Sequence, residues 1–202
     1  IGSLGVIQTS DNTAVGSEAL DSLTSGVNNT AVGRQSLTAA TTSSNNVAVG
    51  HQSAYNTTSA ADDNVFIGYQ AAFSNGNGDD SVIIGSGAGK ESAQFDKCVA
   101  IGKGAMQETG VLMSQNVAIG WEALKNAESG SGDEGNNNVA VGTSALATNT
   151  TGSASTAVGY GALTSQTTPG VNSAFGNLAG TALTTATDNT LVGYQAGVSN
   201  LT

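Results

Sequence analysis

The side chains that most often carry out chemistry are scarce in this sequence. His51 is the only histidine and Cys98 the only cysteine among 202 residues. A nucleophile needs a base within hydrogen-bonding reach, and that base needs a third group to orient it. A lone imidazole and a lone thiol supply neither arrangement. The sequence therefore indicates a protein that is not an enzyme and that uses no cofactor.

Acidic pairs are the remaining candidates for chemistry. The pairs are Asp62-Asp63, Asp79-Asp80 and Asp133-Glu134. Calcium requires six to eight oxygen ligands, and the sequence contains neither an EF-hand loop nor the G-G-x-G-x-D repeat that supplies them. We interpret these carboxylates as solvated charges in loops and predict no metal site.

Charge and composition exclude several classes of partner. The chain carries five Lys plus Arg against fifteen Asp plus Glu, a net charge of −10. Nucleic acids and anionic membranes both require a basic surface, which this composition does not provide. No apolar run approaches the roughly 18 residues of a membrane span, so we expect no membrane insertion in this segment.

A short unit recurs along the whole chain and is the dominant feature of the sequence. Each copy ends a short triplet with a glycine, and in seven of the eleven copies the triplet is β-branched, small, β-branched; the copies are 17 or 18 residues apart except for one interval of 22. The marking glycines are Gly16, Gly33, Gly50, Gly68, Gly85, Gly102, Gly120, Gly142, Gly159, Gly176 and Gly193. A fixed period of this kind is typical of a solenoid.

The period and the triplet together predict the fold. Paired-helix repeats need roughly 33 residues or more, whereas 17 suits one turn of a β-coil with turn-forming Ser, Thr, Asn and Gly in its loop. We predict an all-β fold, a parallel β-roll or β-solenoid of about 11 short coils. Residues 1–202 should form one continuous array, which we expect to be a segment of a longer fibre protein.

The alternation within the triplet predicts two faces for each strand. Val, Ile or Phe always precedes the glycine, and we place this residue inside the coil. Ala stands two before the glycine in eight of the eleven units, which suggests close approach of another surface. Val49→Asp should then unfold or disassemble the protein. After the glycine comes a pair such as Ala19-Leu20, and its spacing leaves open which member faces inward.

An asparagine precedes most triplets. Stacked coils would place these residues in a column whose side-chain amides bond to one another and to the backbone. The members are Asn12, Asn29, Asn46, Asn64, Asn116, Asn138, Asn172 and Asn189. Ser81, Cys98 and Ser155 take the same place in three units, so we interpret Cys98 as a small residue in an asparagine position.

The residue after each glycine varies most and should be exposed. We expect His51, at this position, to be an exposed bystander whose replacement by Ala leaves the melting temperature unchanged. The aromatic members of this column are candidates for surface contact, either with sugars or partner proteins or with a neighbouring subunit. They are Tyr69, Trp121, Tyr160 and Tyr194.

A single stack of such coils should be marginally stable. Each coil offers one Val or Ile, one Leu and a few alanines, while ordering its residues has a large entropic cost. Association through a further apolar face would hide more surface, and closed symmetric oligomers are the common solution. We therefore expect the chain to associate with further copies of itself; the number of copies, a homotrimer, is what the resemblance described next implies.

The unit N-[TVS]-A-[VI]-G-x-x-A-L resembles the head repeats of YadA-like trimeric adhesins. It is more similar still to the NTAVGYQAL arrays of phage tail-fibre proteins, through "NVFIGYQAA", "NTLVGYQAG" and "NVAIGWEAL". The resemblance covers nearly the whole chain, and it implies parallel β-rolls wound as homotrimeric fibres.

Two functions follow from this resemblance as expectations. The first is a structural segment of a phage-type tail fibre on the virion, a rigid spacer that contributes to host attachment through a cell-surface glycan or protein receptor. The alternative is the head or stalk of a bacterial trimeric autotransporter adhesin, on the bacterial outer surface, that binds host or matrix surfaces.

Overall fold

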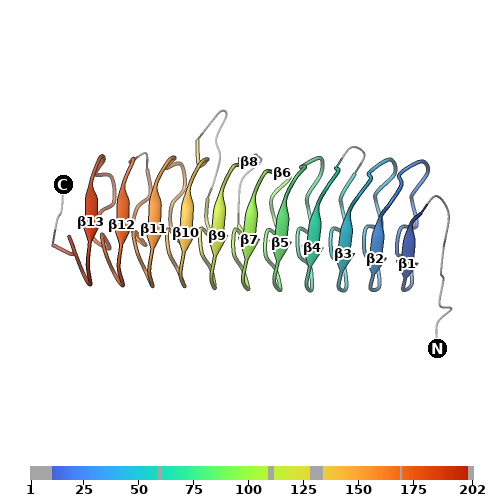
Figure 1. The fold of residues 1–202 in the computed structure, drawn as a ribbon, viewed down its shortest axis with the longest axis horizontal. Coiled ribbons are helices and arrows are strands. Elements are labelled where there is room, and N and C mark those ends of the chain that lie inside the picture. Colours follow the sequence, from blue (N-terminus) through green and yellow to red (C-terminus); the bar gives the residue numbers. More distant parts are fainter. Residues whose placement is uncertain (1–10, 59–60, 109–111, 128–133, 169, 200–202) are drawn as a thin grey trace.

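The chain forms a parallel β-solenoid, as the repeat predicts. A computed structural model describes residues 11–58, 61–108, 112–127, 134–168 and 170–199, and this part of the chain contains strands and turns but no helix. Figure 1 shows the coils following one another along a single axis, with the first described coil at one end and the last at the other.

Eleven of the thirteen strands form one long parallel sheet in the order β1-β2-β3-β4-β5-β7-β9-β10-β11-β12-β13. Each has three residues and ends just before a marking glycine. The strands are β1 (Thr13–Val15), β2 (Thr30–Val32), β3 (Val47–Val49), β4 (Val65–Ile67), β5 (Val82–Ile84), β7 (Val99–Ile101), β9 (Val117–Ile119), β10 (Val139–Val141), β11 (Thr156–Val158), β12 (Ser173–Phe175) and β13 (Thr190–Val192).

The sheet keeps its register from one end to the other. Thr13 pairs with Thr30, Ala14 with Ala31 and Val15 with Val32, and the same alignment of triplets continues through every later pair. In the interval of 22 residues, β9 and β10 still pair in register, so the additional residues lie outside the ladder. Equivalent positions of the repeat therefore form columns along the axis.

A second, smaller sheet lies away from the long one. It consists of β6 (Phe95–Asp96) and β8 (Met113–Ser114), which pair in parallel on the loop side of two successive coils. Phe95 and Met113 are buried there against the inside of the solenoid. The repeat does not predict this sheet, because its residues fall in loops of variable sequence.

Steric contact between neighbouring coils explains why glycine occupies the marking positions. At Gly159, a Cβ would lie 2.3 Å from the carbonyl oxygen of Gly176 in the next coil, and φ is +139°. Real Cβ atoms do not approach a backbone oxygen so closely, and L residues rarely adopt this φ. The same contact with the following glycine recurs along the column, so the spacing between coils requires glycine here.

The interior is lined from two sides of each coil. The middle residue of the triplet is buried in ten of the strands, from Ala14 to Ala174, and half-buried at Leu191 in β13. Both members of the pair after the glycine are buried in most coils, for example Ala19 and Leu20, which answers the question that spacing left open. The return segment packs directly against the inner face of the sheet.

Candidate interaction surfaces

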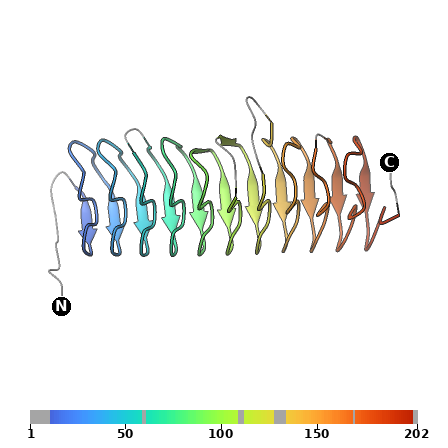
Figure 2. The same cartoon turned by 180° about the vertical axis from the view of Figure 1, so that it is seen from behind.

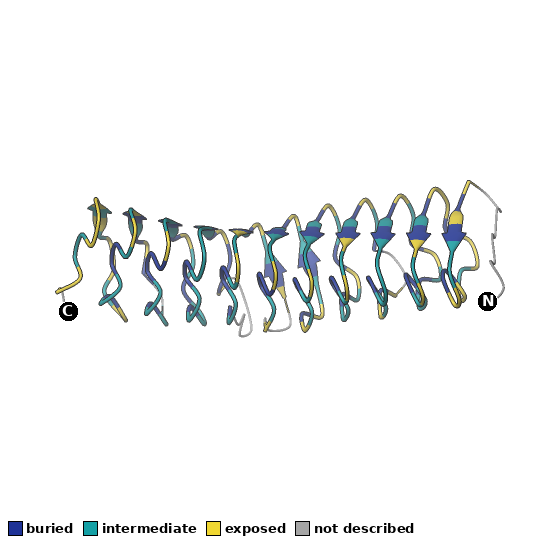
Figure 3. Cartoon of the chain, turned by 90° about the horizontal axis from the view of Figure 1, so that it is seen from below, coloured by how far each residue is buried: buried dark blue, intermediate teal, exposed yellow. Residues whose placement is uncertain are grey.

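The outer face of the long sheet carries a long row of partly exposed apolar side chains. We define the outer stripe as the first and last residues of its eleven strands. These side chains are half-buried or exposed, while the residue between them faces inward. Figure 3 shows the strands lying along one edge of the solenoid, with the loops opposite, and Figure 2 shows the same row of strands from behind.

The predicted orientation of the triplet was therefore wrong. Ala48 in β3 is fully buried, and Val49 beside it is half-exposed on the outer stripe. The physical reason is that the coil is thin. In six coils the return segment brings Leu or Met against the sheet, and the inner position of the strand in each of these coils is Ala. The larger β-branched residues are left outside.

The dimensions of the outer stripe suggest a partner. Eleven strands spaced about 4.8 Å apart give a length of roughly 50 Å, and the two residues of each triplet span about 7 Å. This strip covers about 350 Å² before side-chain width is added, which is comparable to the largest apolar patch of a typical soluble monomer, a patch that is often functional. Val32, Ile67, Ile119 and Phe175 are among its exposed members.

We define the aromatic column as all the residues that directly follow a marking glycine; its aromatic members are Tyr69, Trp121, Tyr160 and Tyr194. Tyr69, Trp121 and Tyr160 are 52%, 52% and 56% exposed, and Tyr194 is 72% exposed. The predicted candidates for surface contact are thus all accessible in a single chain. His51 differs from its prediction as an exposed bystander: it is half-buried and stacks on Tyr69, with ring centroids 5.6 Å apart.

The asparagine column lies inside the solenoid and joins neighbouring coils. The backbone N–H and the side-chain amide of Asn29 both donate to Oδ1 of Asn12, at 2.7 and 3.1 Å. The Asn29 amide also donates to the carbonyl oxygen of Ser43 at 2.7 Å. Asn46 repeats the pattern one coil later, with Asn29 as acceptor. Each such asparagine therefore ties two coils to a loop.

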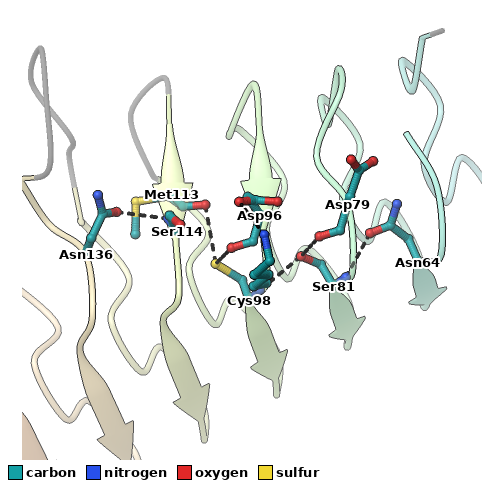
Figure 4. Close-up of polar contacts among 9 residues, drawn as sticks. Asn64, Asp79, Ser81, Asp96, Cys98, Met113, Ser114 and Asn136 are labelled. Carbon is teal, nitrogen blue, oxygen red and sulfur yellow. Dashed lines mark hydrogen bonds and ion pairs between the residues drawn. The ribbon is translucent and has the colours of Figure 1, made fainter. Parts of the chain in front are cut away.

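Where asparagine is absent, the column continues through smaller groups, as Figure 4 shows. The backbone N–H of Ser81 donates to Asn64 Oδ1 at 2.9 Å, and that of Cys98 donates to Ser81 Oγ at 3.0 Å. At Ser155, a buried Gln166 supplies the missing amide by donating to Ser155 Oγ and accepting from Asn172. The column therefore consists of side chains that hydrogen-bond to the backbone of a neighbouring coil, and not all of them are asparagines.

Cys98 sits in this column as a buried thiol. Its Sγ lies 3.4 Å from the carbonyl oxygen of Met113 and 3.5 Å from that of Asp96, and it donates to both. Burial raises the pKa of the thiol from 9.0 to about 11, and hydrogen bonds from neighbouring backbone only partly oppose this effect. A neutral, enclosed thiol is a poor nucleophile.

Two of the acidic pairs accept backbone hydrogen bonds in the turns between coils. Asp62 Oδ1 accepts the backbone N–H of Ser44 at 2.6 Å, and Asp79 Oδ1 accepts that of Asp62 at 2.8 Å. The second member of each of these pairs adopts a left-handed conformation, with φ of 58° at Asp63 and 54° at Asp80. Short polar side chains tolerate this region best. Among the described residues no group of acidic, His or Cys side chains could hold a metal ion; Asp133 lies outside them.

The chain matches no family model, no curated protein and no solved structure. No helix in the described part of the chain has the length and apolar character to span a bilayer. The outer stripe and the aromatic column are therefore the features of the chain that bear on function.

Proposed function

We propose that this chain is a structural, non-enzymatic segment of a phage-type tail fibre, in which three copies associate through their outer stripes to form a rigid spacer. One observation carries the proposal. Most β-branched side chains of the triplets lie outside the coil, in two columns that a single chain leaves partly uncovered and that only Ser173 and Phe175 interrupt. A parallel sheet is ordinarily covered on both faces.

The stiffness of a spacer is supported by the bonding between coils. Neighbouring strands pair in register along the whole sheet, and the asparagine column adds side-chain bonds between the same coils. The number of copies is supported by the resemblance to tail-fibre and adhesin repeats. Three narrow stripes can face one axis, and closed symmetry leaves none of them exposed.

A second candidate is the head or stalk of a trimeric bacterial adhesin. The exposed aromatic column favours it, because a row of accessible Tyr and Trp side chains suits binding to a surface ligand. The two proposals share the fold and the association of three copies. They differ in flanking sequence: a virion-attachment domain supports the fibre, whereas a signal peptide with a membrane anchor supports the adhesin.

Light scattering combined with crosslinking of the purified chain tests the association. We expect three times the chain mass of 19.8 kDa and a crosslinked species of three chains. Val141→Asp, on the outer stripe of β10, should reduce the mass to that of one chain. Thr42→Asp, in an exposed loop, is the matched control and should leave the mass unchanged. A wild-type mass of one chain with a cooperative melt would contradict the proposal.

A further inference from the structure

Three aromatic side chains lie on alternate coils of the aromatic column. The backbone ladder continues through this column, with each carbonyl oxygen accepting an N–H from the next coil at 2.8–2.9 Å. The bonds are Ser144 to Trp121, Gly161 to Thr143, Leu178 to Tyr160 and Gln195 to Asn177. Successive members are therefore one strand spacing apart, about 4.8 Å, and Trp121, Tyr160 and Tyr194 recur at about 9.6 Å.

The members between these aromatics are short and polar. Thr143 separates Trp121 from Tyr160, and Asn177 separates Tyr160 from Tyr194. Elsewhere in the column, His51 and Tyr69 occupy adjacent coils and stack on each other at an interplanar angle of 29°. Alternation with Thr and Asn prevents that mutual stacking. Trp121 and Tyr160 are each more than half exposed, so part of each ring is accessible to a ligand.

We infer that Trp121, Tyr160 and Tyr194 form a binding platform for a neutral, linear polysaccharide of β-1,4-linked pyranoses lying along the solenoid axis. In such a chain each sugar is turned over relative to the one before it. The same apolar C–H face therefore returns with every second sugar, at a repeat of one disaccharide, which is close to the length of two coils. These faces stack on aromatic rings, as apolar surfaces at interfaces do.

Charge selects a neutral glycan over an anionic one. The chain has a net charge of −10; Glu122, which directly follows Trp121, is paired with Lys125 at 3.7 Å, so the selection depends on the overall charge. Repulsion would oppose a sulfated or sialylated chain over its whole length. Between the rings, the hydroxyl of Thr143 and the amide of Asn177 have the chemistry to bind sugar hydroxyls.

The inference rests on the host-attachment part of the proposed function and names the class of ligand that the fibre would contact. It does not depend on how many copies associate. A platform on one chain requires only that the aromatic column stays accessible, so glycan binding and chain mass can be measured as separate properties of the same samples.

Trp121 is the only tryptophan of the chain, so its emission reports on the platform directly. The full chain is titrated with cellohexaose and with N-acetylchitohexaose. We expect a saturable change in Trp121 emission with at least one of them, and a loss of affinity of about tenfold or more for Tyr160→Ala. Tyr69→Ala is the matched control, an exposed tyrosine of the same column outside the two-coil spacing, and should bind within twofold of wild type.

Several results would overturn the inference. These are no saturable change with either hexasaccharide at millimolar concentration, equal losses for Tyr160→Ala and Tyr69→Ala, and binding of a heparin hexasaccharide as tight as that of the neutral ones. Light scattering on Tyr160→Ala should give the wild-type mass; a smaller mass would mean that the ring packs between copies, which also overturns it. Glycan binding by a wild-type chain that proves monomeric supports the platform and counts against the trimer alone.

Discussion

The two faces of the long sheet differ in a way opposite to most soluble strands. Within the three residues of β3, Ala48 is fully buried and Val49 is half-exposed. Soluble antiparallel sheets usually place the large apolar side chain inside and a polar one outside. Here the inner face meets a return segment that supplies Leu or Met in six coils; in the coil of β3 it supplies Ala54, and the preceding coil supplies Leu37. The difference is that the larger residues face outward at a constant register, which is the observation behind our proposal that another copy covers them.

The exceptions on the inner face support this explanation. Phe66 and Ile83 replace Ala in β4 and β5, and in those coils the residue four after the glycine shrinks to Ala72 and Gly89. A Cβ at Gly89 would lie 2.7 Å from Cε2 of Phe95 and 3.2 Å from Cγ2 of Ile83. In these coils a larger strand residue therefore accompanies a smaller return residue, whereas the coils of β3 and β12 are small at both positions.

The largest expected effect comes from placing a charge on each face of β3. Ala48→Asp buries a carboxylate without a partner, and it should destabilise the chain by more than about 4 kcal/mol and abolish the cooperative melt. Val49→Asp leaves its carboxylate solvated, so the fold of the single chain should lose at most about 1 kcal/mol while association is lost. Circular dichroism melts and light scattering distinguish the two. Unfolding by Val49→Asp alone would reverse the assignment of faces.

Two phenylalanines give a matched test by truncation. Phe66, in β4, is fully buried, whereas Phe175, in β12, lies on the outer stripe and is 42% exposed. Phe66→Ala should cost about 3–5 kcal/mol through the cavity that it leaves. Phe175→Ala should cost less than about 1 kcal/mol in the single chain and should weaken association. Denaturant unfolding measures both, and equal losses for the two variants in a monomeric background would contradict the comparison.

The free energy of unfolding should also depend on pH through Cys98, which lies on the inner side of the solenoid. The folded pKa of about 11 lies above the ordinary value of 9.0, so the free energy of unfolding is unaffected by this group below pH 9. As pH rises from 9 through 11, the free energy of unfolding should fall by up to about 1.4 kcal/mol per pH unit, or about 3 kcal/mol in total. Cys98→Ser, which copies Ser81 and Ser155, should lack this component of the decline. The same alkaline slope in the wild type and the variant would exclude it.

The smallest expected effect belongs to the aromatic column at the edge of the outer face. His51→Ala removes the stack on Tyr69 and should lower the free energy of unfolding by about 0.5–1.5 kcal/mol. This expectation replaces the unchanged melting temperature that the sequence alone suggests. Arg34→Ala, in the preceding coil of the same column, is an exposed control with an expected effect within about 0.5 kcal/mol. A neutral result for His51→Ala would mean that the stack contributes no stability.

The period of the repeat predicts most of the fold. Recurrence of the triplet and its glycine gives the parallel sheet, its register and the columns, because only units of matching shape can stack at one strand spacing. The alternation of the triplet shows two faces, but it cannot say which is inside. That choice depends on the opposite wall of the coil, and the signal was present in the sequence as small residues at Ala72 and Gly89 wherever the strand carries Phe66 or Ile83.

Other features lie beyond what single-sequence reasoning reaches. The pairing of β6 with β8 depends on loops that the repeat does not constrain. The left-handed conformation of Gln35 and Leu37 is also unexpected, since non-glycine residues rarely adopt it. It recurs at equivalent positions because the chain must turn several times within one short coil. The aromatic column was predicted as exposed, whereas the stack of His51 on Tyr69 required knowledge of the coil spacing.

Thiol labelling at adjacent positions of β3 tests the central claim most directly. Single cysteines replace Ala48 or Val49 in a Cys98→Ser chain, both in the assembled protein and with Val141→Asp, which should separate the copies. We predict that position 48 is labelled only on unfolding, and that position 49 is labelled rapidly in separated chains but slowly in the assembly. Faster labelling at 48 than at 49, or equal rates at 49 in both states, would contradict the account.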